Sequence, residues 1–196
     1  MLFRSRRVSD QRIVVDPEMQ ARVLRPYKPD CRYLKRSTVE IPEAGADHLV
    51  RLHGELAIER SCYIDETGHF NSVEFNLCYN QLVYTLMAQC VASSLLPAFA
   101  SMTLSEYFAR QLPDVLIHEF SSKFRRPLNS RAFRGTVSIV EAHDRRKFLV
   151  CATHCTFEDD QGGLAQGEVT LAIVHRAVAS TGGDADARPV AAREPA

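Results

Sequence analysis

The sequence of 196 residues lacks the features that mark several large classes of protein. No stretch reaches the roughly 18 apolar residues that a membrane-spanning helix needs, and the first residues, MLFRSRR, have no long apolar run behind their charges. Neither sign of charge is in excess, since 24 Lys and Arg residues balance 24 Asp and Glu residues. We therefore expect a cytoplasmic protein that binds neither nucleic acid nor a membrane through its overall charge, although a local basic patch stays open.

Sequence motifs for nucleotide binding, serine hydrolysis and zinc binding are also missing. There is no GxGxxG after a strand, no GxxxxGKS or GxxxxGKT, and no GxSxG. None of the six cysteines forms a CxxC pair, so we expect free, buried thiols. Cys151 and Cys155 flank His154, but the alternation across 148–157 predicts a strand that places His154 on the opposite face from both cysteines. We expect no metal site and no cofactor.

Three helices are predicted, over 17–24, 73–96 and 104–112. The first begins with Asp16 as its cap and Pro17 at its first position. The second is apolar on nearly every face, which indicates a buried helix, and Pro97 ends it. The third begins at the capping-box spacing of Thr103 and Glu106.

A period of two in the apolar pattern predicts strands over 48–58, 115–124, 133–142, 147–157 and 164–175, with a hairpin turn at 159–163. Because the strands come mainly after one helix, the expected fold is α+β, with an antiparallel sheet of five to six strands wrapped around the long helix and an N-terminal helical extension. Residues 27–33 are expected to form a turn-rich lead-in. The domain is expected to span 17–177, between a mobile N-terminus (1–16) and a disordered tail (178–196).

The most informative stretch is 61–84, SCYIDETGHFNSVEFNLCYNQLVY, where a polar loop runs directly into the apolar helix. His69 is a candidate general acid or base, or an idle surface histidine. Asn71 is a candidate helix cap, substrate contact or both. Glu74 lies in the first turn of the predicted helix, where the helix dipole stabilises its negative charge whether or not it takes part in the reaction.

Other polar residues in and before the helix are also candidates for the site. Asn80 sits among apolar neighbours and needs a hydrogen-bond partner, which is a substrate, a water or Asn76 one turn earlier. Tyr27 and Tyr63 are either core aromatic residues with a polar tip or members of the site.

A second candidate region is the basic segment FSSKFRRPLN at 120–129. Strand alternation sends Lys123 and Arg125 to one side and Arg126 to the other. These cations suit a phosphate or phosphopantetheine arm at the mouth of a pocket. The alternative is a solvated strand edge guarded by charge.

Together these segments resemble the FcoT-type long-chain acyl thioesterases of the hotdog superfamily. The matching segments are ARVLRPY (21–27), CRY (31–33), 63–84 and SSKFRRPLN (121–129), and the similarity spans roughly 20–175 in the same order. Gly68-His69-Phe70 is also similar to the Gly-His-Phe of hotdog acyl-carrier-protein dehydratases. Their acidic partner on the helix would fall near Asn80, and an amide there argues against dehydratase chemistry.

The resemblance implies an acyl-thioester pocket at a dimer interface, with Tyr27, Tyr63, Asn71 and Asn80 around the thioester and no Ser or Cys nucleophile. Members of the family are associated with adding glycine to the β-carbon of a (2E)-enoyl thioester in lipopeptide and other secondary-metabolite pathways, and hydrolysis can follow. The implied partners are an acyl-carrier-protein or CoA thioester, glycine, and a second copy of the chain in a homodimer or dimer of dimers. The alternatives are a plain long-chain acyl-CoA thioesterase and a non-catalytic acyl-binding subunit.

In either reaction, negative charge develops on the thioester oxygen, and N–H donors around Phe70 and Asn71 are expected to stabilise it. His69 is the expected base, with Glu74 as the alternate. Tyr63 and Asn80 are expected to orient the substrate or the nucleophile. Phe70, Asn71 and Asn76 complete the expected binding surface.

Overall fold

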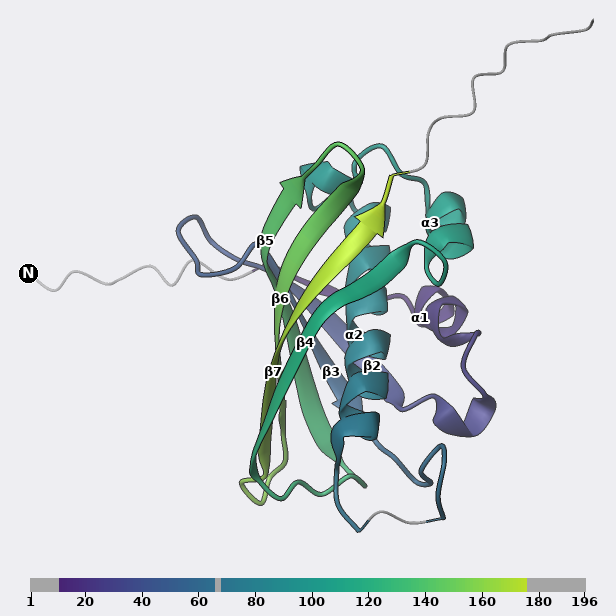
Figure 1. Cartoon of the computed structure of the whole chain (residues 1–196), viewed down its shortest axis with the longest axis vertical. Coiled ribbons are helices and arrows are strands. Elements are labelled where there is room, and N and C mark those ends of the chain that lie inside the picture. The colour runs from purple at the N-terminus through teal and green to yellow at the C-terminus, as the bar shows by residue number, and fades with distance from the viewer. Residues whose placement is uncertain (1–10, 66–67, 176–196) are drawn as a thin grey trace, which may run out of the picture.

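A computed structural model describes residues 11–65 and 68–175 of the chain (Figure 1). Within these residues, seven strands form one antiparallel sheet in the order β1-β2-β3-β5-β6-β7-β4. The strands are β1 (Gln11–Val14), β2 (Leu34–Ile41), β3 (Val50–Leu56), β4 (Val115–Arg126), β5 (Phe133–Asp144), β6 (Phe148–Glu158) and β7 (Leu164–Val174).

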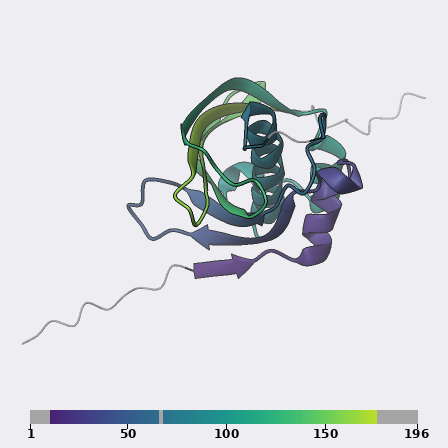
Figure 2. The same cartoon turned by 90° about the horizontal axis from the view of Figure 1, so that it is seen from below.

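The long central helix α2 (Ser72–Ala92) lies inside the curve of this sheet. Figure 2 shows the sheet curling around α2, while α1 (Pro17–Leu24) lies outside the curl. The remaining helices are α3 (Leu104–Arg110) and the single 3₁₀ turns η1 (Pro29–Cys31) and η2 (Pro97–Phe99). An antiparallel sheet wrapped around one buried helix confirms the expected α+β hotdog fold. No helix in the described part of the chain is long and apolar enough to cross a membrane.

Glycines let α2 lie directly on the sheet. Gly54 and Gly135 pair across β3 and β5, and a Cβ on either would come within 2.5 or 2.7 Å of a Leu82 methyl carbon. At Gly167 a Cβ would lie 2.7 Å from Cζ of Phe75. At Phe75 and Leu82, α2 therefore lies close to the backbone of the sheet. This contact sets the position of the N-terminal half of the helix.

The sheet has two strands more than the five located from the sequence. Residues 34–41 form β2, which was not predicted, because its alternation is interrupted by a bulge between Leu34 and Arg36. Residues 11–16 were expected to be mobile, but 11–14 form the edge strand β1, and Asp16 caps α1 by accepting a hydrogen bond from the Met19 N–H. The backbone hydrogen bonds of this short edge strand go to residues 38–41, which are distant in the sequence, so its own four residues show no clear strand pattern. The expected tail at 178–196 lies outside the described residues.

The predicted helices are found with shifted ends. The first matches its predicted span of 17–24. The long helix ends at Ala92, four residues before the predicted end, since Ser94 takes a left-handed conformation with φ of 50°. The third ends at Arg110. The predicted turn at 159–163 joins β6 to β7.

Candidate active site

The N-terminal end of α2 is closed by a reciprocal capping box. The side-chain oxygen of Asn71 accepts from the N–H groups of Val73 and Glu74, at 2.9 and 3.4 Å. In return, the Glu74 carboxylate accepts from the Asn71 N–H at 3.2 Å and from the Ser61 hydroxyl at 3.0 Å. Glu74 is fully buried, and each of its oxygens is engaged. It therefore holds the loop against the helix, and this geometry favours a positioning role over that of a base.

The cap is also linked to Tyr63. The Asn71 side-chain N–H donates to the Tyr63 hydroxyl oxygen at 2.8 Å, and Tyr63 is half exposed. Because that oxygen accepts this bond, the hydroxyl keeps its own proton to donate. Asn71 thus combines the two roles that were left open, since it caps the helix and orients a hydroxyl that faces solvent.

The backbone donors expected near Phe70 and Asn71 are already engaged. The Phe70 N–H donates to the Leu128 carbonyl at 3.3 Å, and the Asn71 N–H donates to Glu74. These two N–H groups are therefore not available to an oxyanion in this structure, and the predicted role of N–H donors at the helix start stays a prediction. The Tyr63 hydroxyl is an exposed donor at the same end of the helix.

Phe70 was expected to touch substrate, but its ring is buried in the core. It is 2% exposed, and its ring centroid lies 5.1 Å from those of Phe133 and Phe157. Phe75 and Phe124 complete this cluster. Aromatic packing of this kind anchors the loop and so fixes its exposed neighbour, His69.

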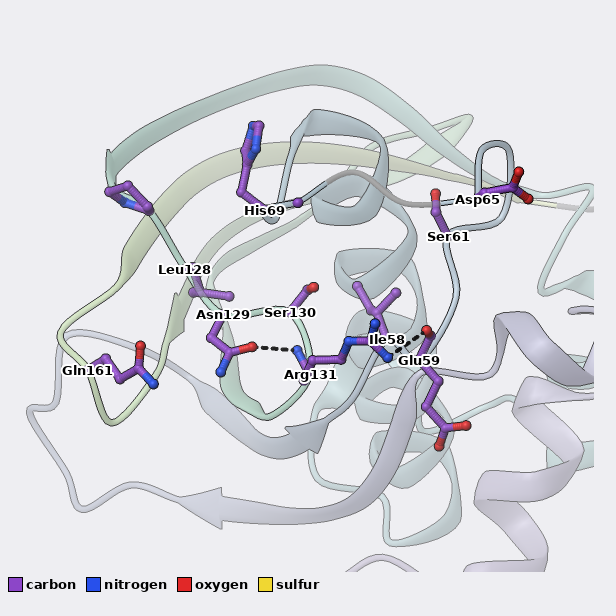
Figure 3. A pocket seen from close by; sticks show the side chains of 12 residues that line it. Ile58, Glu59, Ser61, Asp65, His69, Leu128, Asn129, Ser130, Arg131 and Gln161 are labelled. Carbon is purple, nitrogen blue, oxygen red and sulfur yellow. Dashed lines mark hydrogen bonds between the residues drawn. The ribbon is translucent and has the colours of Figure 1, made fainter.

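His69 lies between two hollows. The first, of about 330 Å³, is lined by residues from 58–65, 68–69 and 127–131 and by Gln161 (Figure 3). The second, of about 540 Å³, is lined by Phe70, Asn71, Ser72, Phe124, Arg125, Arg126 and Pro127. His69 is exposed and forms part of the lining of both hollows.

The floor of the first hollow is built from residues that the sequence did not single out. The Arg131 guanidinium donates to the Glu59 carbonyl at 3.0 Å, and the Asn129 side-chain oxygen accepts from the Arg131 N–H at 2.9 Å. In Figure 3, Arg131 crosses the hollow, and the His69 ring points away from it. Ser61 and Asp65 lie on the wall across from Leu128 and Gln161.

Asp159 joins the β6–β7 turn to this floor. Its carboxylate accepts from the N–H groups of Asn129 at 2.6 Å, Gly163 at 2.7 Å and Gln161 at 2.9 Å. These backbone hydrogen bonds, that of Asn129 foremost, hold the pKa of Asp159 below its usual value. Only the turn itself was predicted here. The sequence signal for these contacts was an Asp at the start of a Gly-rich turn, since such side chains accept hydrogen bonds from nearby backbone N–H groups.

The three cations of β4 do not act as one group. The pairing of β4 with β7 is irregular between Phe124 and Arg126, and this bulge breaks the expected alternation at Arg125. Arg125 and Arg126 border the larger hollow beside His69. Lys123 instead lines, together with Arg125, a separate hollow of about 190 Å³ on the outer face of the sheet.

Asn76 and Asn80 form a pair along the side of α2, and Tyr27 lies near Tyr84 and Cys78 of the same helix. The Asn80 side-chain N–H donates to the Asn76 side-chain oxygen at 2.9 Å, which confirms the predicted partner. Burial, followed by the neighbouring Tyr84 and Cys78, raises the pKa of Tyr27 above its usual value. None of the three lines either hollow beside His69. Within one chain, the predicted site residues therefore lie in two places, one at the N-terminal end of α2 and the other along its side.

The cysteine pattern agrees with the predicted strand. Cys151 and Cys155 are buried on the inner face of β6, and His154 is exposed on the outer face. Burial raises the pKa of both thiols, to about 12 at Cys151. These thiols are core side chains.

Comparison with known proteins places the whole domain in one family. The model of the FcoT-like thioesterase domain matches residues 22–173. A protein of Streptomyces coeruleorubidus named (2E)-enoyl-ACP glycyltransferase is 40% identical, over 83% of this chain and 99% of that protein. Its namesake from Mycobacterium marinum is 37% identical, over 81% of this chain and 86% of that protein. A solved thioesterase from Pseudomonas aeruginosa is 15% identical at a TM-score of 0.39, over 67% of this chain and 78% of that one, and adds no weight. The chain belongs to the FcoT-like thioesterase family.

Proposed function

We propose that this protein adds glycine to the β-carbon of a (2E)-enoyl thioester carried by an acyl-carrier protein. The names of its relatives support this substrate pair. The structural observation that carries the proposal is the position of His69 between two hollows. A conjugate addition brings two organic substrates to one base, whereas hydrolysis brings one substrate and a water.

The larger hollow suits the enoyl thioester, and the smaller suits glycine. Phe124 and Pro127 give the larger hollow an apolar wall, and Arg125 and Arg126 stand at its edge, where a phosphopantetheine arm needs cations. The smaller hollow is lined by Ser130 and by Arg131, whose hydroxyl and positive charge suit a carboxylate. Glycine bound by its carboxylate keeps its amine free, and the exposed His69 side chain must turn toward this hollow to reach that amine.

The addition needs one proton transfer in each direction. His69 removes a proton from the glycine nitrogen as that nitrogen bonds to the β-carbon. The electrons of the carbon–carbon double bond move toward the thioester carbonyl, and the oxygen of the resulting enolate accepts the Tyr63 proton as a hydrogen bond. His69 then returns its proton to the α-carbon. Nothing is oxidised or reduced, and the thioester bond stays intact until a separate hydrolysis.

The protein is proposed to act as a homodimer in the cytoplasm. β4 is an edge strand of the sheet, and it exposes Leu116, Ile117 and Phe124 by 45, 39 and 44%. An edge with large exposed apolar side chains is a ready surface for pairing with a second copy. Its burial would extend the sheet across two subunits.

A direct assay separates the candidate functions. A trans-2-octenoyl thioester of a carrier protein, or of pantetheine, is incubated with and without glycine, and the products are weighed by mass spectrometry. The expected product is heavier by one glycine and keeps its thioester. Release of the thiol at a rate independent of glycine would instead establish a plain thioesterase. No change in either substrate over a range of chain lengths would favour a non-catalytic subunit.

Asn71→Ser separates the capping role of Asn71 from its contact with Tyr63. Serine caps helices about as well as asparagine, so the free energy of unfolding should change by less than about 0.5 kcal/mol. Serine has no amide to donate to Tyr63, so the rate of glycine addition should fall roughly tenfold as the hydroxyl loses its orientation. Asn71→Ala should lose the same rate and, in addition, about 1 kcal/mol of stability. An unchanged rate in Asn71→Ser would show that the Tyr63 contact has no part in the reaction.

A further inference from the structure

Six of the 24 Lys and Arg residues lie in one short segment that the proposed site does not use. Residues 21–36 contain six cations and one acid, Asp30, although the whole chain has no net charge. The six cations are Arg22, Arg25, Lys28, Arg32, Lys35 and Arg36, and they are called the α1–β2 patch below. All are exposed except Arg32, which is partly buried. The neutral net charge of the whole chain does not explain this local excess of positive charge.

The α1–β2 patch is not neutralised within the described chain. Elsewhere Arg51 lies 3.9 Å from Glu40, Arg110 lies 2.9 Å from Asp114 and Arg134 lies 2.6 Å from Asp160. Across residues 11–65 and 68–175, none of the six patch cations lies within 4.0 Å of a carboxylate oxygen. Arg22 lies 4.1 Å from the centroid of the Phe108 ring, which does not cancel its charge. A segment with this excess of positive charge favours a partner that brings acids.

The backbone under the patch is held rigidly by buried glutamines. Gln81 of α2 accepts from the N–H groups of Tyr33 and Leu34, at 2.9 and 3.0 Å, and donates to the Cys31 carbonyl at 2.7 Å. Gln20 donates to the Lys35 carbonyl at 3.2 Å. The cations therefore stand on a preorganised frame, which lowers the entropic cost of binding a partner.

Three patch cations border a groove with an apolar floor. Arg32, Lys35 and Arg36 line a groove of about 590 Å³ between α1 and β2, opposite the single acid Glu55. Its apolar lining includes Val14, which is 77% exposed, together with Leu24 and Leu34. A cationic edge over an apolar floor is complementary to an amphipathic helix whose polar face is acidic.

The patch is connected to the loop that lines the candidate active site. The Tyr33 hydroxyl donates to the Arg60 carbonyl at 3.2 Å, and the Ala57 N–H donates to the Tyr33 carbonyl at 3.0 Å. Figure 1 shows η1 and this loop at the same end of the molecule. A partner bound here therefore lies beside the 58–61 wall of the hollow next to His69.

We propose that the α1–β2 patch and its groove dock an acidic helix of the acyl-carrier protein that presents the enoyl thioester. This assignment rests on the proposed function and deepens it, because it names the surface that recognises the carrier protein. The carrier supplies the acids that the patch lacks, and its prosthetic arm delivers the enoyl group to the larger hollow.

The test is the triple charge reversal Arg25→Glu, Lys28→Glu, Lys35→Glu, assayed on two substrates. A trans-2-octenoyl group is attached to a discrete acidic acyl-carrier protein or to pantetheine. With the carrier substrate, kcat/KM should fall at least about tenfold and lose most of its dependence on salt. With the pantetheine substrate it should stay within about twofold, because that substrate makes no contact with the patch.

The matched control is Arg145→Glu, Arg146→Glu, Lys147→Glu. These exposed cations lie in the β5–β6 turn and give the same change in net charge. This control should leave kcat/KM with the carrier substrate within about twofold. An equal loss in the control, or an equal loss on both substrates in the patch variant, would overturn the docking assignment.

Direct binding keeps this test separate from the proposed reaction. The Kd of the unacylated carrier protein, measured by calorimetry, should rise at least about tenfold in the patch variant, whether or not glycine addition is observed. Unchanged affinity in an active enzyme would refute docking alone. Absence of the glycine adduct in the unmodified protein would refute the reaction alone.

Discussion

Replacement of His69 by alanine is expected to lower the rate of glycine addition by about 10²- to 10³-fold, which is the usual contribution of a general acid–base side chain. The loss should appear mainly in kcat, because the imidazole moves protons and does not hold the acyl chain. Thermal stability should not change, since His69 is exposed and its neighbour Phe70 supplies the buried anchor of the loop. Steady-state kinetics and a thermal melt of the same preparation measure both effects.

The matched control is His154→Ala. His154 is also exposed, but it lies on the outer face of β6, away from the hollows that His69 borders. The control should retain the full rate. If His69→Ala retains more than about a third of the original rate, His69 is not the base, and Glu74→Gln becomes the next variant to test.

Gly163→Ala is expected to destabilise the fold by about 3 kcal/mol and to remove the floor of the smaller hollow. A Cβ at this position would lie 2.6 Å from three atoms, namely the Asp159 carboxylate, the Leu128 Cα and the Pro127 carbonyl oxygen. Two of these are backbone atoms, which cannot rotate away as a side chain can. The β6–β7 turn must therefore move off residues 127–129 and break the bond between Asp159 and the Asn129 N–H. A thermal melt should show a midpoint lower by roughly 10 °C.

The neighbouring glycine provides the comparison. Gly162 has φ of +88°, and a Cβ added there would meet nothing within 4 Å, so Gly162→Ala carries only the backbone cost of a left-handed residue, about 1–2 kcal/mol. Gly163→Ala should therefore be the more damaging of the two in both stability and activity. Equal effects would mean that local turn strain, and not the contact between the turn and the 127–129 segment, governs this corner of the site.

Local patterns in the sequence predicted the parts of the fold that depend on near neighbours. The Asp16-Pro17 start of α1, the cap at Asn71 and the turn at 159–163 each involve groups within a few residues of one another. The alternation of the later strands was equally readable, because one face of each packs against α2. Strands β1 and β2 were missed, since β1 has little apolar signal of its own and a bulge interrupts the pattern of β2.

Spacing along the chain was a weaker guide to the site. His69 and Asn71 were found because a polar loop before an apolar helix is a local feature. Phe70 was assigned to substrate, and it does line the larger hollow, but most of its ring packs in the core against aromatic residues of distant strands. Lys123 and Arg125 share one hollow and Arg126 borders the other, as the alternation predicts, but Arg125 at the bulge borders both, which spacing alone did not show.

The sequence by itself determined the family resemblance, the order of helix and sheet, and the residues that begin α2, because each of these is encoded in contiguous segments. Only the tertiary structure decided how those residues are used. It buried Glu74 in the capping box, placed His69 between two hollows, and separated Tyr27, Asn76 and Asn80 from both. It also tied the cationic segment 21–36 to α2 through Gln81, a contact between residues about fifty positions apart. The physical reason is that hydrogen-bond partners and burial are set by packing in space, which strand pairing and the approach of α2 to the sheet establish together.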